Sequence, residues 1–183
     1  MYRQYSRVSY FGESGQIEIY LDASPFGLGG VLCIKGIPVT YFTSPLDKHD
    51  ERIHRQAIGD SAGQQAWECL AVLVALRAWY STWISQRAKI TIKGDNVSAL
   101  AMASRMKLGP TASLIGKELS LLYYEAQFEP EVIHIPGITN ILADSLSRLH
   151  DPTGHYEIPP TLAKLEPTPV PVRDESFYWV LAT

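Results

Sequence analysis

The sequence predicts an α/β fold, in which a mixed five-stranded sheet carries helices on its faces. Residues 16–22 alternate polar and apolar side chains, as half-buried strands do. Residues 88–94 and 131–135 also have strand character, and segments with helical periodicity lie before and after each of them. The resulting order, β-β-β-α-β-α-α-β-α, is typical of one sheet covered by helices.

The first three strands are expected at residues 16–22, 29–34 and 37–43. Residues 23–27 supply turn-forming side chains between the first two strands, and Lys35-Gly36 reads as a hairpin turn between the second and third. Short turns of this kind join antiparallel neighbours, so the opening of the chain is predicted to be an antiparallel meander.

The segment 44–65 is polar and carries charge of both signs. A connection of this length is uncommon and is usually functional or mobile. Within it, residues 52–55 are predicted to form a short strand.

Four helices are expected, at residues 66–84, 96–104, 111–127 and 140–149. The first of them is apolar over much of its circumference, which indicates a helix packed on more than one side. Asp95 or Asn96 is placed to cap the second.

The two ends of the chain differ in composition from the middle. Residues 1–15 are polar and aromatic and are interpreted as an N-terminal extension that continues from an upstream domain. Residues 16–150 are predicted to form one domain. Six of the twelve prolines fall between Pro152 and Pro171, so residues 151–183 are predicted to be an extended tail, with an apolar end that is suited to docking.

The composition excludes several classes of protein. Apolar residues make up 46% of the chain, enough for a packed core. The two cysteines, Cys33 and Cys69, form neither a disulfide framework nor a zinc pattern, so we expect a reducing, intracellular setting. We expect no secretory signal, because residues 1–15 are polar and aromatic. We expect no membrane association, because no apolar run approaches the roughly 18 residues of a membrane span.

Four acidic residues have notable positions. Asp22 and Asp95 end predicted strands, where ligands gather in open α/β sheets. If the first and fourth strands are parallel neighbours, these two side chains lie side by side. Glu68, one turn into the long helix, and Asp144, in the last helix, would then complete a cluster.

Such a cluster favours bound cations, since neighbouring carboxylates repel one another and are costly to bury while charged. Ligands that are all oxygen suit Mg²⁺ or Mn²⁺, and a pair of such ions serves phosphodiester chemistry. Taken singly, each acid also has a simpler interpretation. Asp22 and Asp95 could be turn or cap residues, Glu68 a first-turn acid favoured by the helix dipole, and Asp144 a solvated side chain.

The four acids lie in four ordered motifs: Asp22-Ala23-Ser24 with Gly27 and Gly29; Trp67-Glu68-Cys69-Leu70-Ala71; Gly94-Asp95-Asn96; and His134-Ile135-Pro136-Gly137 with Asn140 and Ala143-Asp144-Ser145-Leu146-Ser147-Arg148. With these motifs, the chain from about residue 16 to residue 149 resembles the ribonuclease H domain of LTR (gypsy-like) retroelement reverse transcriptases. The closing motif is the most specific of them.

The resemblance implies a ribonuclease H-like fold, whose sheet has three antiparallel strands followed by two parallel ones. It implies hydrolysis of the RNA strand of RNA–DNA hybrids, leaving 3′-hydroxyl and 5′-phosphate ends. Asp22, Glu68, Asp95 and Asp144 would be the catalytic acids and would hold two Mg²⁺ or Mn²⁺ ions, with Glu68 near the RNA 2′-hydroxyl. An upstream reverse transcriptase polymerase domain is the expected partner within the protein.

Contacts to the hybrid are expected near the acids and on basic side chains, namely at Ser24, Asn96, Arg105, Lys107 and Lys117. The basic residues could equally be solvated surface charges. The net charge of −3 is unusual for a nucleic-acid-binding domain, so we expect weak affinity for nucleic acid with strong salt dependence.

Two features depart from the family. Its cellular members carry a mobile histidine before the last helix, whereas residues 136–139 contain none; His134, within the strand, is interpreted as structural. The segment 44–65 is longer than expected, and His49, His54 and Arg55 in it could contact substrate or lie in solvent.

Three alternatives stay open. The chain could be a catalytically silent ribonuclease H-like spacer or nucleic-acid-binding domain, or a nuclease of the same fold acting on DNA. An unrelated α/β binder of small molecules is the third, but the glycine-rich residues 27–30 run into a strand rather than a helix, which makes a poor phosphate loop.

Overall fold

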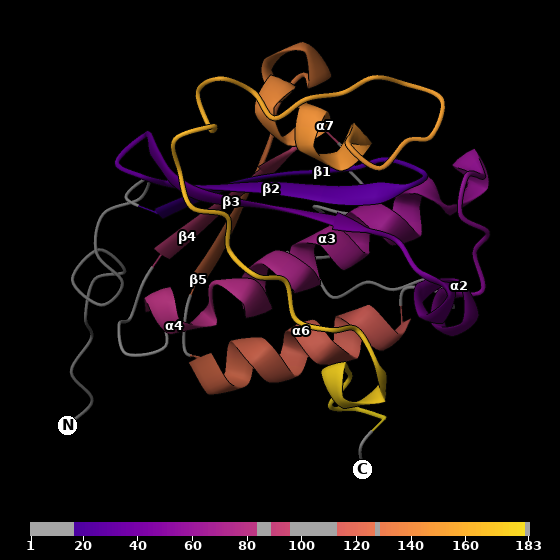
Figure 1. The fold of residues 1–183 in the computed structure, drawn as a ribbon. Coiled ribbons are helices and arrows are strands. Elements are labelled where there is room, and N and C mark those ends of the chain that lie inside the picture. The colour runs from indigo at the N-terminus through magenta and orange to yellow at the C-terminus, as the bar shows by residue number, and fades with distance from the viewer. Residues whose placement is uncertain (1–16, 84–88, 96–112, 127–128, 182–183) are drawn as a thin grey trace, which may run out of the picture.

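The computed structural model describes residues 17–83, 89–95, 113–126 and 129–181 (Figure 1). Its five strands form one sheet in the order β3-β2-β1-β4-β5. β1 pairs antiparallel with β2, and β2 with β3, whereas β4 runs parallel to both β1 and β5. The predicted mixed sheet is therefore confirmed, with strands at Ile17–Ala23 (β1), Gly27–Ile34 (β2), Ile37–Pro45 (β3), Lys89–Gly94 (β4) and Glu129–His134 (β5).

The hairpin between β2 and β3 has the turn that its sequence predicts. Lys35 and Gly36 both have positive φ, at 53° and 78°. Two successive residues in this region make a turn whose twist matches that of the flanking strands. This tight turn places β3 beside β2, and β3 lies at one edge of the sheet.

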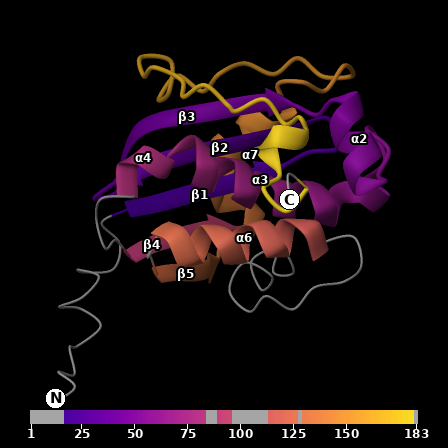
Figure 2. The ribbon, with the colours of Figure 1, turned by 90° about the horizontal axis from the view of Figure 1, so that it is seen from below.

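Helices cover both faces of the sheet (Figures 1 and 2). α3 (Gln64–Ala78) and α6 (Ser113–Ala126) lie on one face, and α7 (Ile141–Arg148) lies on the other. The ten consecutive residues 67–76 of α3 are all buried, which confirms that this helix packs on more than one side. The expected helix over 66–84 breaks at Trp79, and the short α4 (Tyr80–Trp83) follows it. The expected helix at 96–104 lies outside the described residues.

The segment 44–65 contains a helix, α2 (Lys48–His54), so the short strand predicted at 52–55 was wrong. The reason is a capping box. The Asp47 carboxylate accepts hydrogen bonds from the backbone N–H groups of His49 and Asp50, and the Asp50 carboxylate accepts one from the N–H of Asp47. Arg55, with φ of 53°, ends the helix in the left-handed conformation.

Residues 151–181, which we call the C-terminal strap, run from one face of the sheet to the other (Figure 1). On the α7 face, the buried Leu162 packs with Val31 and Tyr41. The strap then passes the edge of the sheet, where the N–H of Thr168 donates to the carbonyl of Tyr41 at 2.7 Å. The end of the strap lies beside α3 and α6 (Figure 2), and its Tyr178 belongs to the main hydrophobic core.

Two buried ion pairs lie where the end of the strap docks. Arg173 pairs with Asp50 of α2 at 2.7 Å. Arg77 of α3 pairs with Glu118 of α6, and the other carboxylate oxygen of Glu118 accepts a hydrogen bond from the N–H of Val180. In the part of the chain that the structure describes, no helix has the length and apolar character needed to traverse a bilayer.

Candidate active site

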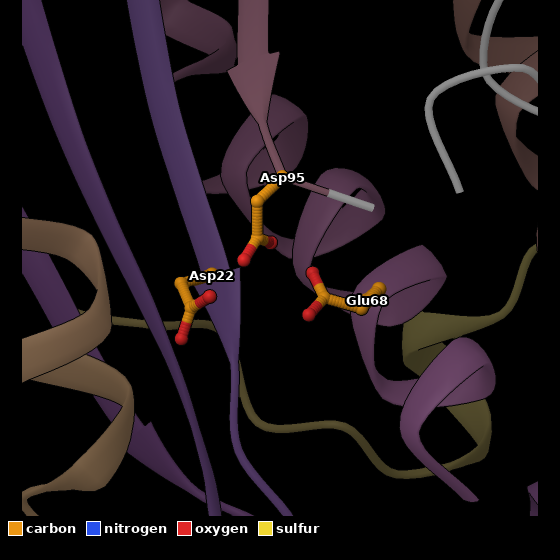
Figure 3. A group of neighbouring side chains, drawn as sticks. All are labelled: Asp22, Glu68 and Asp95. Carbon is orange, nitrogen blue, oxygen red and sulfur yellow. The ribbon is translucent and has the colours of Figure 1, made fainter. Parts of the chain in front are cut away.

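Three acidic side chains converge at the carboxyl ends of β1 and β4 (Figure 3). Asp22 lies near the end of β1, Asp95 directly follows β4, and Glu68 lies one turn into α3. One carboxylate oxygen from each of the three lies within 4.8 Å of the others. They meet because β1 and β4 are parallel neighbours, so both strands end at the same edge of the sheet.

Two of these acids are buried, which makes their charged forms costly. Asp22 and Glu68 are each 6% exposed, whereas Asp95 is exposed. Burial raises the pKa of Asp22 to about 7, and the nearby charges of Asp144 and Asp95 also raise it. Burial, with the neighbouring charge of Asp22, raises the pKa of Glu68 well above its usual range.

The donor set fits a divalent metal ion. All three groups offer oxygen, the ligand that Mg²⁺ and Mn²⁺ prefer. Asp22 and Glu68 are buried next to the carboxylate of Asp95, and a bound cation would neutralise the negative charge of these groups. Asp22, Glu68 and Asp95 are thus the described residues that could hold such an ion.

Asp144, the fourth predicted acid, lies beside this group but outside it. It is in the first turn of α7, and its Oδ1 accepts a hydrogen bond from Nε of Arg148 at 2.7 Å. Its side chain is 40% exposed. The charge of Asp144 still reaches Asp22, whose pKa it raises.

Hydrogen bonds hold the two buried carboxylates in place. Nε2 of Gln64, one turn before Glu68 on α3, donates to Oε1 of Glu68 at 2.9 Å and also contacts the carbonyl of Ala23. Oγ of Ser147, on α7, donates to Oδ2 of Asp22. The sequence reasoning missed both residues. The i, i+4 spacing of Gln64 and Glu68 could have indicated the first contact.

The turn after β5 lies next to Asp95. Nε2 of His134 lies 3.1 Å from the backbone carbonyl of Asp95, and only a ring N–H can donate there. His134 therefore contacts the main chain of Asp95 rather than its carboxylate group. Gly137, in the same turn, lies near that carboxylate, because a β-carbon added at Gly137 would lie 3.0 Å from Oδ2 of Asp95.

The residues predicted to contact nucleic acid have different placements. Ser24 is buried; its hydroxyl donates to the carbonyl of Ser147 at 2.8 Å and accepts from the N–H of Gly27 at 3.0 Å. The structure therefore gives Ser24 a role in the packing of α7. Lys117 is exposed on α6. Asn96, Arg105 and Lys107 lie outside the described residues.

Among the residues considered in the segment 44–65, His54 is buried and contacts Tyr178 of the strap at 2.9 Å between Nε2 and the hydroxyl. Burial lowers the pKa of His54 to about 4, so this imidazole is neutral at physiological pH. The suggestion that His54 contacts substrate was therefore wrong.

No protein-family model matches the sequence, and none of the curated proteins matches it significantly. Similarity is found among solved structures. Ribonuclease H1 from Halobacterium salinarum superposes with a TM-score of 0.54 at 18% identity, covering 72% of this chain and 94% of that one. LC11 ribonuclease H1, solved in complex with an RNA/DNA hybrid, gives a TM-score of 0.58 at 18% identity, covering 71% and 92%.

The N-terminal ribonuclease H domain of a Mycobacterium tuberculosis protein, solved as a fusion with maltose-binding protein, gives a TM-score of 0.56 at 13% identity, covering 73% of this chain and 91% of that one. This chain superposes on nearly the whole length of each of these structures. The chain therefore has the ribonuclease H fold.

Proposed function

We propose that this chain is a ribonuclease H, an endonuclease that hydrolyses the RNA strand of RNA–DNA hybrids with two Mg²⁺ or Mn²⁺ ions. The observation that carries the proposal is the group of Asp22, Glu68 and Asp95 at the ends of two central parallel strands. The structural neighbours support it, because they are ribonucleases H1 or a ribonuclease H domain, and one of them holds an RNA/DNA hybrid.

The chain's own residues would prepare this site for metal ions. Asp22, Glu68 and Asp95 would hold the ions, and Asp144 would contribute from the rim. When bound, such ions supply an activated water and stabilise the leaving oxygen. Gln64 keeps the carboxylate of Glu68 in one orientation through its hydrogen bond. The burial of Asp22 and Glu68 limits competing water, which strengthens their attraction for a cation.

Contacts with the hybrid are proposed for the exposed Lys117 and for Asn96, Arg105 and Lys107. The buried hydroxyl of Ser24 is fully used inside the protein, so we leave this residue out of the proposal. The products would carry 5′-phosphate and 3′-hydroxyl ends.

The origin and setting of the domain are proposed from the sequence motifs. The closing motif, from His134 to Arg148, supports a retroelement reverse transcriptase as the parent protein, with a polymerase domain upstream of a nuclease domain at residues 16–150. Both cysteines are buried and free, which fits a reducing compartment inside the cell.

Cleavage of an end-labelled RNA–DNA hybrid tests the proposed activity. Wild type should cut the RNA strand with Mg²⁺ or Mn²⁺, fail with EDTA, and leave duplex DNA and duplex RNA intact. Asp95→Asn should abolish cutting, because it removes one ligand charge from the group. Glu157→Gln, which changes an exposed acid on the strap, is the matched control and should cut like wild type. A folded wild type that cuts no hybrid would favour a catalytically silent domain, and cutting of duplex DNA would indicate a DNA nuclease.

A further inference from the structure

We propose that Ser147 is a positioning residue, which fixes the orientation of the Asp22 carboxylate for metal binding. The proposal rests on the metal centre of the proposed function. It also accounts for two sequence features that the four acids leave unexplained, the glycines of β2 and the second serine of the closing motif.

The hydroxyl of Ser147 is placed to hold one oxygen of Asp22. Ser147 is completely buried, and its Oγ donates to Oδ2 of Asp22. A serine hydroxyl has one hydrogen to donate, and the carbonyl of Asp144, at 3.0 Å, is the more distant acceptor. A bond to a carboxylate is also the stronger of the two when that group is charged. The rotation of the Asp22 carboxyl plane is therefore restricted by a side chain from another element.

The glycines of β2 allow α7 to come close enough for this contact. Gly29 is the cross-strand partner of Asp22. A β-carbon at Gly29 would lie 2.5 Å from the carbonyl oxygen of Ala143 and 2.6 Å from the backbone nitrogen of Ser147. At Gly27, a β-carbon would lie 2.7 Å from the carbonyl oxygen of Ser147. Larger residues would push the helix away from the strand, and the hydroxyl would no longer reach Asp22.

A second hydrogen bond fixes the same part of α7. The hydroxyl of Ser24, two residues after Asp22, donates to the carbonyl of Ser147 at 2.8 Å. Ser24 thus fixes the backbone of Ser147, while the side chain of Ser147 holds the carboxylate of Asp22. Groups that orient metal ligands in this way commonly change metal affinity when they are removed.

Isothermal titration of Mn²⁺ into the full chain, without nucleic acid, tests this role. Ser147→Ala should weaken Mn²⁺ binding about tenfold, the lower end of the range for residues that orient ligands. Ser147→Cys, which keeps a side chain of similar size with a weaker donor, should give an intermediate affinity. Urea unfolding of each variant shows whether the fold is retained.

Ser145→Ala is the matched control, because Ser145 is a partly exposed serine on the same helix whose hydroxyl donates to the carbonyl of Ile141 rather than to an acid of the site. It should bind Mn²⁺ like wild type. Wild-type affinity in a folded Ser147→Ala variant, or equal weakening in both alanine variants, would overturn the proposal.

Hybrid cleavage is measured separately, so the two ideas can fail independently. A wild type that binds Mn²⁺ but cuts no hybrid would remove the proposed function, while the role of Ser147 would still be decided by the Mn²⁺ affinities. A wild type that binds no Mn²⁺ would overturn the role of Ser147 along with the metal centre.

Discussion

Arg148 and Asp144 form an ion pair one helical turn apart on α7, with Nε of the arginine 2.7 Å from Oδ1 of the aspartate. This ion pair uses one carboxylate oxygen of Asp144. Asp144 is the predicted metal-site acid that lies outside the group of Asp22, Glu68 and Asp95. The positive charge of Arg148 also reaches the group, where it lowers the pKa of Asp22. The four predicted acids are therefore not equivalent in this structure.

Asparagine substitutions should separate these acids. Asp22→Asn removes a buried ligand charge from the centre of the group and should lower the rate of hybrid cleavage by at least ~100-fold, whereas Asp144→Asn, at the rim, should lower it about tenfold. Single-turnover cleavage at saturating Mg²⁺ measures both rates. Equal losses in the two variants would mean that Asp144 binds metal as directly as Asp22 does.

The stability of the metal-free protein should depend on pH through the buried acids. Asp22 has a pKa of about 7 in the folded protein against an ordinary value of 3.8, so the folded state binds more protons than the unfolded state between these values. The contribution of Asp22 to the free energy of unfolding should therefore fall as pH rises from about 4 to about 7. The raised pKa of Glu68 acts in the same direction, whereas the lowered pKa of the buried His54 acts in the opposite direction. Urea unfolding in EDTA across this range measures the effect.

Two comparisons identify the groups responsible for that dependence. Asp22→Asn should remove the contribution of Asp22 to the pH dependence, since asparagine does not titrate, whereas Glu157→Gln, at an exposed acid, should leave the dependence unchanged. Mg²⁺ should raise the unfolding midpoint more at pH 8 than at pH 5, because the ion binds the charged carboxylates of the folded state. If Asp22→Asn leaves the pH dependence of the metal-free protein unchanged, the assignment to Asp22 is contradicted.

Gly137 is predicted to leave room for Asp95. Gly137→Ala would place a β-carbon 3.0 Å from Oδ2 of Asp95, close enough that the carboxylate must shift. Mn²⁺ affinity and hybrid cleavage should both fall, while the urea midpoint changes little because the turn is exposed. Ile138→Ala, at the adjacent side chain that is 85% exposed, is the control and should retain Mn²⁺ affinity. Full affinity in Gly137→Ala would show that the carboxylate has space to move.

Much of the fold could be predicted because its signals are local. The strands expected from alternation at 16–22 and 88–94 appear at Ile17–Ala23 and Lys89–Gly94, and the turn expected at Lys35-Gly36 is present, because these signals depend on neighbours in the chain. The meeting of Asp22 with Asp95 followed from the parallel pairing of two strands. The helix at 48–54 was also locally encoded by Asp47 and Asp50, but the charged segment was interpreted as a connection with a short strand at residues 52–55.

Other features could not be predicted because they depend on contacts between distant parts of the chain. Ser147 and Asp22 are separated by 125 residues, and nothing in the local pattern of either shows that they meet. The same holds for Arg173 and Asp50, which are 123 residues apart. The prolines of residues 151–183 indicated an extended chain, whereas the surface on which it docks is formed only when α2, α3 and α6 are packed together.

The strap is predicted to stabilise the domain through its buried ion pair. The side chain of Asp50 is fully buried and that of Arg173 is 4% exposed, and Arg173 also donates to Oγ of Ser44 at 2.7 Å. Arg173→Met would leave Asp50 buried without its partner and should lower the free energy of unfolding by about 3–5 kcal/mol. Adding Asp50→Asn to this variant should restore part of the loss, since the uncompensated charge is removed. Lys48→Met breaks the exposed pair with Glu51, where Lys48 is 91% exposed, and should change the urea midpoint little. If Arg173→Met unfolds at the same urea concentration as wild type, the ion pair of Arg173 with Asp50 does not stabilise the domain.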